Sequence, residues 1–209
     1  MHPRAAAVPY QAILFDFDGV LVDTEPLHFA CWRDILRLFG VELDWDTYNV
    51  RCRGVADHDM IGALCALRSP PAPFEAVWAE YPAKKQRFRA LAAANDLVSD
   101  AVRSLLEELA GYRLAVVSSS ARAEVEPILA RGGIHRCFGA LVFGEDVERL
   151  KPAPDPYRKA ADLLGAASAL VVEDSQSGLA SGRAAGFNTL FIPRVEDMPR
   201  LVRQRLLLA

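Results

Sequence analysis

The sequence lacks several features that would point to a membrane, secreted or nucleic-acid-binding protein. None of its apolar runs approaches the roughly 20 residues that a membrane-spanning helix needs. The N-terminal segment does not have the pattern of a secretion signal, because its apolar runs are short and the second one ends in acidic residues. The net charge is −3, so there is no basic surplus to hold nucleic acid or an anionic membrane. We therefore expect neither kind of partner.

Metal-binding patterns of cysteine and histidine are missing as well. The four histidines show no ligand spacing, and the four cysteines form no CxxC pair. The cysteines are Cys31, Cys52, Cys65 and Cys137. Scattered cysteines argue against a zinc site or a disulfide framework. They fit reduced thiols in a cytoplasm, which is the compartment we expect.

Two aspartates one residue apart follow a short apolar run. In the segment AILFDFDGVLVDTE, Asp16 and Asp18 come directly after residues 12–15, which read as a central parallel strand. Carboxylates at the C-terminal edge of such a strand lie where open α/β sheets place their sites. There, a carboxylate pair can act as nucleophile and general acid, provided that a cation relieves their repulsion. The alternative is an acidic turn without a catalytic role.

The region after this acidic segment reads as a helical insertion. Apolar residues at helical spacing run from Thr24, a capping residue, to Gly40, which ends the helix. A further helix is expected over roughly 57–68, followed by a break at a proline cluster. One long helix is then expected from Phe74 to about Ala94. No buried strand is predicted in this region.

From Ser99 onward, helical and strand patterns alternate. The expected strands are 114–117, 141–143, 170–172 and the segment TLFIP, and a last helix is expected around 197–207. Repeated helix–strand units predict a parallel sheet with helices on both faces. The predicted fold class is α/β, with a Rossmann-like core and an inserted α-helical cap domain. The predicted boundaries are 1–24 and 90–209 for the core, and 25–89 for the cap.

Polar residues stand at the ends of three of these later strands. They are Ser118 and Ser119, Lys151 in the loop after the next strand, and Glu173 with Asp174. Parallel strands place their C-terminal ends at one edge, so these residues should lie beside the first aspartate pair. An ammonium and a magnesium ion would then allow a carboxylate to attack a phosphoryl group. Taken singly, the serines could form an ordinary loop, the lysine could be solvated, and the acidic pair could cap a helix.

These segments resemble the four motifs of the haloacid dehalogenase superfamily. The first motif, DxDGxLxD[ST]E, matches Asp16, Asp18, Gly19, Leu21, Asp23, Thr24 and Glu25. Ser118 matches the second motif, Lys151 in KPAPDPY the third, and Glu173-Asp174 the fourth. The resemblance covers nearly the whole chain and is closest to the phosphatase and β-phosphoglucomutase subgroup. The dehalogenases are excluded, because they lack the second aspartate of the first motif.

The resemblance implies a role for each matched residue. Asp16 would be the nucleophile that forms an aspartyl-phosphate, and Asp18 would protonate the leaving oxygen and then activate water. Ser118, Ser119 and Lys151 would bind the transferring phosphoryl group. Mg²⁺ would be held by the Asp16 side chain, the Asp18 backbone carbonyl and the Asp174 side chain, with Glu173 helping directly or through water.

The resemblance extends to the insertion, with two departures. Gly54 and Val55 match the GVSRED loop of the mutase, but Asp57 stands where the mutase has a phosphate-binding arginine. Arg122 stands where the mutase has an asparagine. Related mutases carry a histidine at the position of His28, although a partly buried helix histidine is an equal reading.

Four basic residues of the insertion allow two interpretations each. They are Arg51, Arg53, Lys84 and Lys85. They could bind a distal phosphate or carboxylate of the substrate, or they could be solvated surface residues. Together with His28, Arg53 is predicted to bind substrate.

The prediction is therefore a Mg²⁺-dependent phosphatase that acts on a small phosphorylated metabolite, with sugar phosphates among the candidates. A β-phosphoglucomutase-like mutase is the alternative. A non-catalytic binding module is a third, disfavoured because no catalytic position is missing. We also expect the insertion to move about linkers near 23–26 and 88–96. The oligomeric state does not follow from the sequence, which is compatible with a monomer.

Overall fold

The computed structural model describes residues 10–53 and 55–207. The chain divides into two compact units, Met1–Asp23 with Asp96–Ala209, and Thr24–Asn95. We call them the core unit and the helical unit. The second boundary lies later than the predicted residue 90, because the last helix of the helical unit continues to Ala94. The role of the helical unit as a cap stays a prediction.

The core unit is built on a parallel sheet. Its described strands are β1 (Ala12–Phe15), β2 (Arg113–Val117), β3 (Ala140–Val142), β4 (Ala169–Glu173) and β5 (Asn188–Phe191). Their order across the sheet is β3-β2-β1-β4-β5, and every pairing is parallel. All four residues of β1 are fully buried, because this strand has neighbours on both sides and helices cover both faces.

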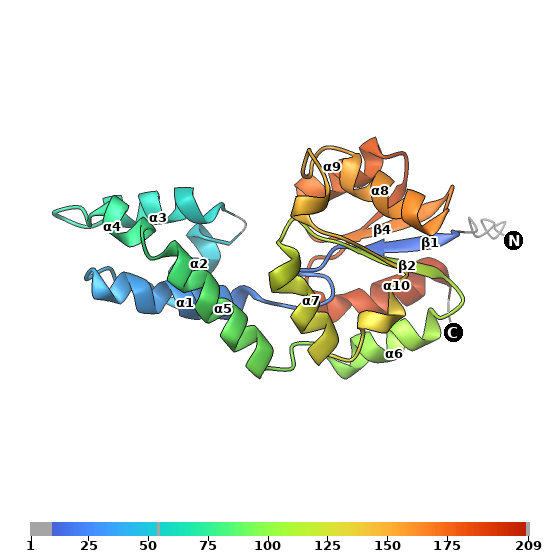
Figure 1. Ribbon diagram of the computed structural model, residues 1–209, viewed down its shortest axis with the longest axis horizontal. Helices are drawn as coiled ribbons and strands as arrows, with labels where there is room; N and C mark the ends of the chain where they lie inside the picture. The colour runs from blue at the N-terminus through green and yellow to red at the C-terminus, as the bar shows by residue number, and fades with distance from the viewer. Residues whose placement is uncertain (1–9, 54, 208–209) are drawn as a thin grey trace, which may run out of the picture. The chain divides into compact units, whose positions relative to one another are not determined.

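Helices flank the sheet on both faces (Figure 1). One face is covered by α8 (Asp155–Leu164) and α9 (Gln176–Ala184), and the other by α6 (Asp100–Glu108), α7 (Arg122–Arg131) and α10 (Met198–Leu206). Short 3₁₀ helices cover His135–Cys137, Gly144–Asp146 and Val195–Asp197. The prediction of an α/β fold with a Rossmann-like parallel sheet is confirmed.

The strand register brings the C-terminal ends of the central strands together. Phe15, the last residue of β1, pairs with Val116 of β2 and with Val172 of β4. The residues that follow these positions are therefore neighbours across the sheet edge, although more than 100 positions separate β1 from β4 in the sequence. This edge is where the candidate site lies.

The helical unit contains α1 (Glu25–Leu38), α2 (Trp45–Arg51), α3 (Asp57–Ala66), α4 (Phe74–Trp78) and α5 (Tyr81–Ala94). None of its described residues lies in a strand, as expected. Its core combines aliphatic and aromatic side chains, and Trp32 stacks parallel to Trp78 and Tyr81, with ring centroids 6.4 and 6.3 Å away. α2 is a helix that the sequence analysis did not predict.

One local prediction in the helical unit is wrong, and another holds for the position of a residue but not for its hydrogen bond. The single long helix expected from Phe74 is broken between α4 and α5. Pro82 explains the break, because its ring would clash with the carbonyl four residues earlier in a continuous helix and is tolerated in the first turn of a new one. Thr24 occupies the N-cap position of α1, but its side chain makes no capping hydrogen bond.

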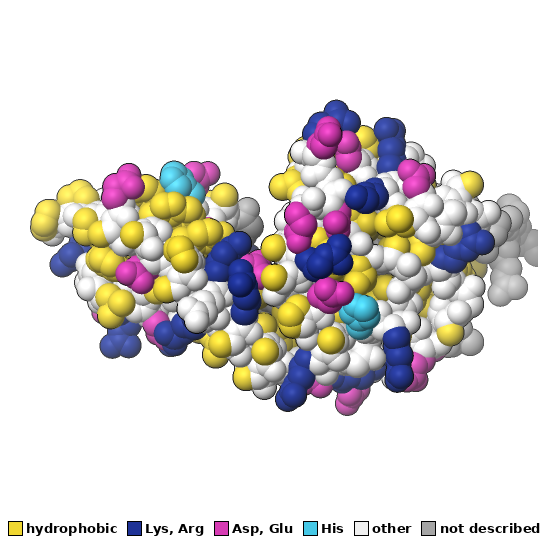
Figure 2. Space-filling view, in the orientation of Figure 1, with side chains coloured by type: hydrophobic (Ala, Val, Ile, Leu, Met, Phe, Trp, Pro, Cys, Tyr) yellow, Lys and Arg dark blue, Asp and Glu magenta, His cyan; other side chains and the backbone are white. Residues whose placement is uncertain are grey.

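The face of the protein shown in Figure 2 carries side chains of both charge signs. Lys and Arg are interspersed there with Asp and Glu. This mixture agrees with a net charge of −3 on a chain with 24 basic and 27 acidic residues. Among the helices of the described residues, none combines the length and the apolar character of a transmembrane segment.

Candidate functional site

Asp16 is the first residue after β1 and lies at the centre of the site. Its backbone N–H donates to the carbonyl oxygen of Val172, 2.9 Å away, which continues the sheet ladder by one residue. Asp16 is only 9% exposed. A carboxylate so far from solvent needs a local counter-charge, which Lys151 provides.

Lys151 reaches this point from the loop that precedes α8. Its Nζ atom lies 2.5 Å from Asp16 Oδ1, 2.7 Å from Glu173 Oε1 and 2.9 Å from the carbonyl oxygen of Val117. Burial alone would lower the pKa of this ammonium, but the two carboxylates raise it above its usual value. Lys151 is therefore a permanent positive charge, and its three donors are all engaged.

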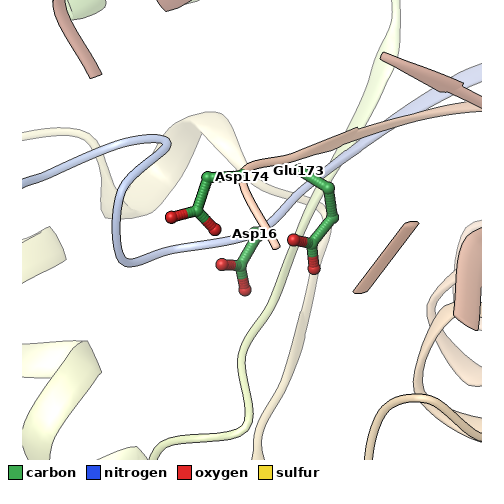
Figure 3. A group of neighbouring side chains, drawn as sticks. All are labelled: Asp16, Glu173 and Asp174. Carbon is green, nitrogen blue, oxygen red and sulfur yellow. The ribbon is translucent and has the colours of Figure 1, made fainter. Parts of the chain in front are cut away.

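Three carboxylates converge around Asp16. Figure 3 shows Asp16 between Glu173 and Asp174, and one ligand atom from each of the three lies within 4.8 Å of the others. Gly19 makes this approach possible. It has a positive φ of 72°, and a Cβ atom there would lie 2.0 Å from Asp174 Oδ2. The glycine of the first motif is thus required both by the turn and by the room that Asp174 needs.

The site carries more negative than positive charge. Three carboxylates face the single ammonium of Lys151. Burial, together with Glu173 and Asp174, raises the pKa of Asp16 to about 8 although Lys151 opposes the shift. For Glu173, burial would raise the pKa, but Lys151 and hydrogen bonds hold it below its usual value. A divalent cation among these oxygens would balance the charge.

The second-motif serines differ in exposure. Ser118 follows β2 and is 5% exposed, and its hydroxyl accepts a hydrogen bond from the Ser120 backbone N–H at 3.1 Å. Ser119 is exposed.

The predicted catalytic residue Asp18 lies in the turn after Asp16 and is half-buried. Its greater exposure suits a residue that exchanges protons with water.

Arg122 occupies the position where the mutase has an asparagine, and it is held by the core unit. Its guanidinium donates to both carboxylate oxygens of Asp146, at 3.2 and 3.0 Å. It also lies over the ring of Phe143, 4.4 Å from the centroid. An ion pair in which one guanidinium nitrogen contacts both carboxylate oxygens, together with the Phe143 ring, fixes this side chain.

In the helical unit, Lys84 forms a second buried cluster. Its Nζ atom lies 2.9 Å from Asp57 Oδ2 and 2.9 Å from His28 Nδ1, and Asp57 Oδ1 accepts from the Trp32 indole at 2.7 Å. Lys84 is 3% exposed, so the prediction that it is a solvated surface cation is wrong, whereas binding of a distal phosphate or carboxylate stays a prediction. The aromatic rings of Trp32, Tyr81 and Phe88 surround it.

His28 is neutral in this cluster. Its ring stacks on Phe88, with centroids 4.3 Å apart. Burial, and then the charge of Lys84, lowers its pKa to about 4. Because Lys84 has no acceptor, it must donate to Nδ1, which leaves the proton of the imidazole on Nε2.

The predicted substrate residue Arg53 lies just after α2 and is exposed. Its Nε atom is 3.9 Å from Glu25 Oε1, and the Tyr48 hydroxyl donates to Glu25 Oε2 at 2.6 Å. Glu25, from the first motif, thus contacts the middle of α2 through Tyr48 and the segment just after α2 through Arg53. Gly54, which matched the mutase loop, lies outside the described residues.

The structure brings together the core residues predicted from four separate strand ends. Asp16, Glu173 and Asp174 converge, Lys151 contacts two of them, and Ser118 follows the neighbouring strand. His28 and Arg53 belong to the other unit, and their role stays a prediction. Sequence reasoning missed Tyr157, whose hydroxyl donates to Glu173 Oε1 at 2.8 Å. It stands in the KPAPDPY segment, but nothing there indicates where its hydroxyl points.

The chain is similar to phosphatases and to phosphosugar mutases. The fructose-1-phosphate phosphatase YqaB of Escherichia coli is 29% identical over 195 residues, which cover 87% of this chain and 95% of the relative. A β-phosphoglucomutase of Mycobacterium bovis is 33% identical over 207 residues, with 85% and 78% covered. The crystal structure of CbbY from Rhodobacter sphaeroides in complex with phosphate is 30% identical, with 87% of this chain and 85% of that chain covered and a TM-score of 0.67.

A family model assigns the chain independently of these pairwise matches. The model of haloacid dehalogenase-like hydrolases matches residues 13–192, which include every motif quoted above. The residues that match the family's motifs are also those that converge in the structure. The chain therefore belongs to the haloacid dehalogenase-like hydrolases, in the subgroup of phosphatases and β-phosphoglucomutase-like proteins, as its motifs predicted.

Proposed function

We propose that the chain is a Mg²⁺-dependent phosphatase that hydrolyses a small phosphorylated metabolite through a phosphoryl group carried transiently on Asp16. One observation carries this proposal. The buried Asp16 carboxylate lies 2.5 Å from the Lys151 ammonium and within 4.8 Å of ligand oxygens of Glu173 and Asp174. A nucleophilic carboxylate, a fixed cation and an acidic corner for a metal are the parts that phosphoryl transfer needs.

The residues present fit Mg²⁺. The candidate ligands are carboxylate oxygens, which hard divalent cations prefer, and one lysine leaves the three carboxylates incompletely neutralised. Asp16, Asp174 and the backbone carbonyl of Asp18 are the proposed ligands. When bound, Mg²⁺ would offset the negative charge of the phosphoryl oxygens as the Asp16 carboxylate approaches.

The remaining chemistry belongs to residues of the chain. An Asp16 oxygen attacks phosphorus, the ester bond breaks, and Asp18 gives its proton to the leaving oxygen. The Asp18 carboxylate then takes a proton from a water molecule, which attacks the same phosphorus and restores the Asp16 carboxylate. The Ser118 hydroxyl holds a phosphoryl oxygen, and the positive charge of Lys151 stabilises the phosphoryl oxygens during both steps.

A sugar phosphate is the proposed substrate class. The E. coli relative is named for fructose 1-phosphate, and the M. bovis relative for a phosphoglucose mutase reaction. Binding of the non-transferred part by His28 and Arg53 is part of this proposal and rests on the resemblance.

Hydrolysis is favoured over mutase activity by two side chains. Asp57 replaces the mutase's phosphate-binding arginine, and its two oxygens are engaged by Trp32 and Lys84. Arg122 stands where the mutase has an asparagine, and its guanidinium forms an ion pair with Asp146. Mutase activity is the second candidate, supported by the 33% identity to the M. bovis enzyme.

The test is a panel of sugar phosphates and other small phosphorylated metabolites incubated with the purified protein and Mg²⁺. We expect release of inorganic phosphate, its loss in EDTA, and a phosphoryl group on the Asp16 peptide after acid quenching. Interconversion of glucose 1-phosphate and glucose 6-phosphate that requires a bisphosphate primer would support the mutase instead. Unchanged turnover in Asp16→Asn would contradict both.

A further inference from the structure

Glu173 is a buried carboxylate that accepts four hydrogen bonds. It is 0% exposed. Its Oε1 atom accepts from Lys151 Nζ at 2.7 Å and from the Tyr157 hydroxyl at 2.8 Å. Its Oε2 atom accepts from the Ser175 backbone N–H at 3.1 Å and from the Ser175 hydroxyl at 2.9 Å. An ionised carboxylate has about four lone-pair positions, so four donors fill it.

The first turn of α9 closes the remaining side of Glu173. A Cβ atom on Gly178 would lie 1.6 Å from Glu173 Oε1, so the helix backbone packs directly against the carboxylate. Ser175 is the N-cap of this nine-residue helix and accepts from the Gly178 N–H at 3.0 Å. The positive end of the helix dipole adds to the donors that hold Glu173 in place.

Tyr157 is the one donor of this set that comes from neither the fourth motif nor the catalytic lysine. Its side chain is fully buried, and its ring lies 5.0 Å from Lys151 Nζ. The hydroxyl and the Lys151 ammonium therefore bind the same carboxylate oxygen, while the ring supports the ammonium from a second direction.

We infer that Tyr157 is a positioning residue that keeps Glu173 turned toward Lys151 and away from the metal position. With its lone pairs occupied, Glu173 serves as an anchor for Lys151, and the direct side-chain ligands are Asp16 and Asp174. Lys151 is thereby fixed against Asp16, where it meets the phosphoryl group. This inference rests on the proposed function, because it concerns how the same site divides its carboxylates between a lysine and a metal.

The test compares Tyr157→Phe with the wild type. The variant keeps the ring beneath Lys151 and removes only the hydroxyl, which opens one lone pair of Glu173 toward a cation. We expect Mn²⁺, used as a probe and measured by electron paramagnetic resonance without substrate, to bind at least about threefold more tightly. We expect kcat to fall about tenfold with KM within twofold, because Lys151 loses its fixed position.

Two further variants control this comparison. Tyr48→Phe also removes a tyrosine hydroxyl from a carboxylate, that of Glu25 in the helical unit, and should leave the Kd for Mn²⁺ unchanged. Ser175→Ala removes the hydroxyl donor from the other oxygen of Glu173 and should tighten Mn²⁺ as Tyr157→Phe does. Ser175→Ala carries the test if Tyr157→Phe does not fold.

The outcomes separate this inference from the proposed function. If the wild type binds Mn²⁺ and releases phosphate but the Kd in Tyr157→Phe stays within twofold, Tyr157 is only a packing residue and the inference is wrong. Weaker binding would also overturn it, since Tyr157 would then orient Glu173 as a direct ligand. If the wild type binds no Mn²⁺ and releases no phosphate, the proposed function fails and the inference with it.

Discussion

The two buried lysines of this protein occupy opposite electrostatic settings. In the core unit, Lys151 faces two buried carboxylates and has a third, Asp174, close by. In the helical unit, Lys84 faces one carboxylate, a neutral imidazole and three aromatic rings. Both side chains are almost inaccessible, at 6% and 3% exposed.

The difference lies in the balance of charge. The single charge of Lys84 is matched by Asp57, so the cluster is complete and acts as a structural centre for its aromatic core. Lys151 cannot match three carboxylates, so the core cluster is left with negative charge that a divalent cation can balance. A buried lysine alone therefore does not identify a candidate site, whereas an excess of buried carboxylates around it points to one.

Substitution of Asp16, the proposed nucleophile, should give the largest difference in turnover between variants of the two clusters. We expect Asp16→Asn to lower turnover by about 10⁴-fold or more, because no other group in the core site replaces the attacking oxygen. The fold should be retained, since one of three converging carboxylates becomes neutral. Phosphate release under saturating substrate measures the effect. Asp57→Asn in the helical unit should instead lower stability and keep turnover, and equal losses in both variants would break the comparison.

Replacement of each lysine should lower the free energy of unfolding by a different amount in the two clusters. Lys151→Met leaves Asp16 and Glu173 buried without a counter-charge, and we expect it to lower the free energy of unfolding by about 3–5 kcal/mol. Lys84→Met leaves only Asp57, whose side chain is 26% exposed and open to water, and should cost about 1–2 kcal/mol.

Urea titration followed by circular dichroism measures these losses. All three tryptophans lie in the helical unit, so their fluorescence reports on that unit separately. A larger loss for Lys84→Met than for Lys151→Met would contradict the charge balance described above.

Metal binding should stabilise the wild type through the core cluster. Mg²⁺ at about 100 times its Kd should raise the free energy of unfolding by about 2.7 kcal/mol, since a ligand that binds only the folded state stabilises it by mass action. Calorimetry with and without EDTA measures the shift. Asp174→Asn should reduce it, and Asp57→Asn should preserve it. An equal Mg²⁺-dependent stabilisation of both variants would show that the metal binds outside the core cluster.

The smallest expected effect is a pH dependence of the helical unit. Burial and then Lys84 lower the pKa of His28 to about 4, below the value near 6.5 that it has when unfolded. Between these values the unfolded chain binds a proton that the folded one does not, so stability falls as pH decreases from about 6.5 to 4. We expect wild type to lose about 2 kcal/mol more than His28→Gln over this window. Tryptophan fluorescence in urea at several pH values tests this, and identical slopes would contradict it.

Much of the core unit could be predicted from the sequence. β1 was expected over the four residues that form it, because a continuous apolar run ending in acidic residues is a local pattern. The later strands agree to within about one residue at most of their ends, for the same reason. The helical unit was harder, since α2 is short and the break before α5 depends on how Pro82 is accommodated.

The sequence predicts which chemical groups belong to the site, but it does not predict their hydrogen-bond and ion-pair partners. Asp16, Ser118, Glu173 and Asp174 stand at strand ends, Lys151 lies in the loop between β3 and α8, and the parallel topology predicts that they share an edge. The hydroxyl of Tyr157, the engagement of Asp57 with Lys84, and the ion pair of Arg122 with Asp146 depend on side-chain directions. No short-range pattern specifies these directions.

By itself, the sequence determined which chemical groups meet at one sheet edge. They are carboxylates from two strand ends and a lysine, brought together by hydrophobic periodicity and parallel strand topology. The tertiary structure decided how charge is divided among these groups. Lys151 lies 135 positions from Asp16 and 22 from Glu173, and only packing makes them neighbours. The physical reason is that backbone pattern follows from local composition, whereas the balance of buried charge depends on distances of a few ångströms between groups remote in the chain.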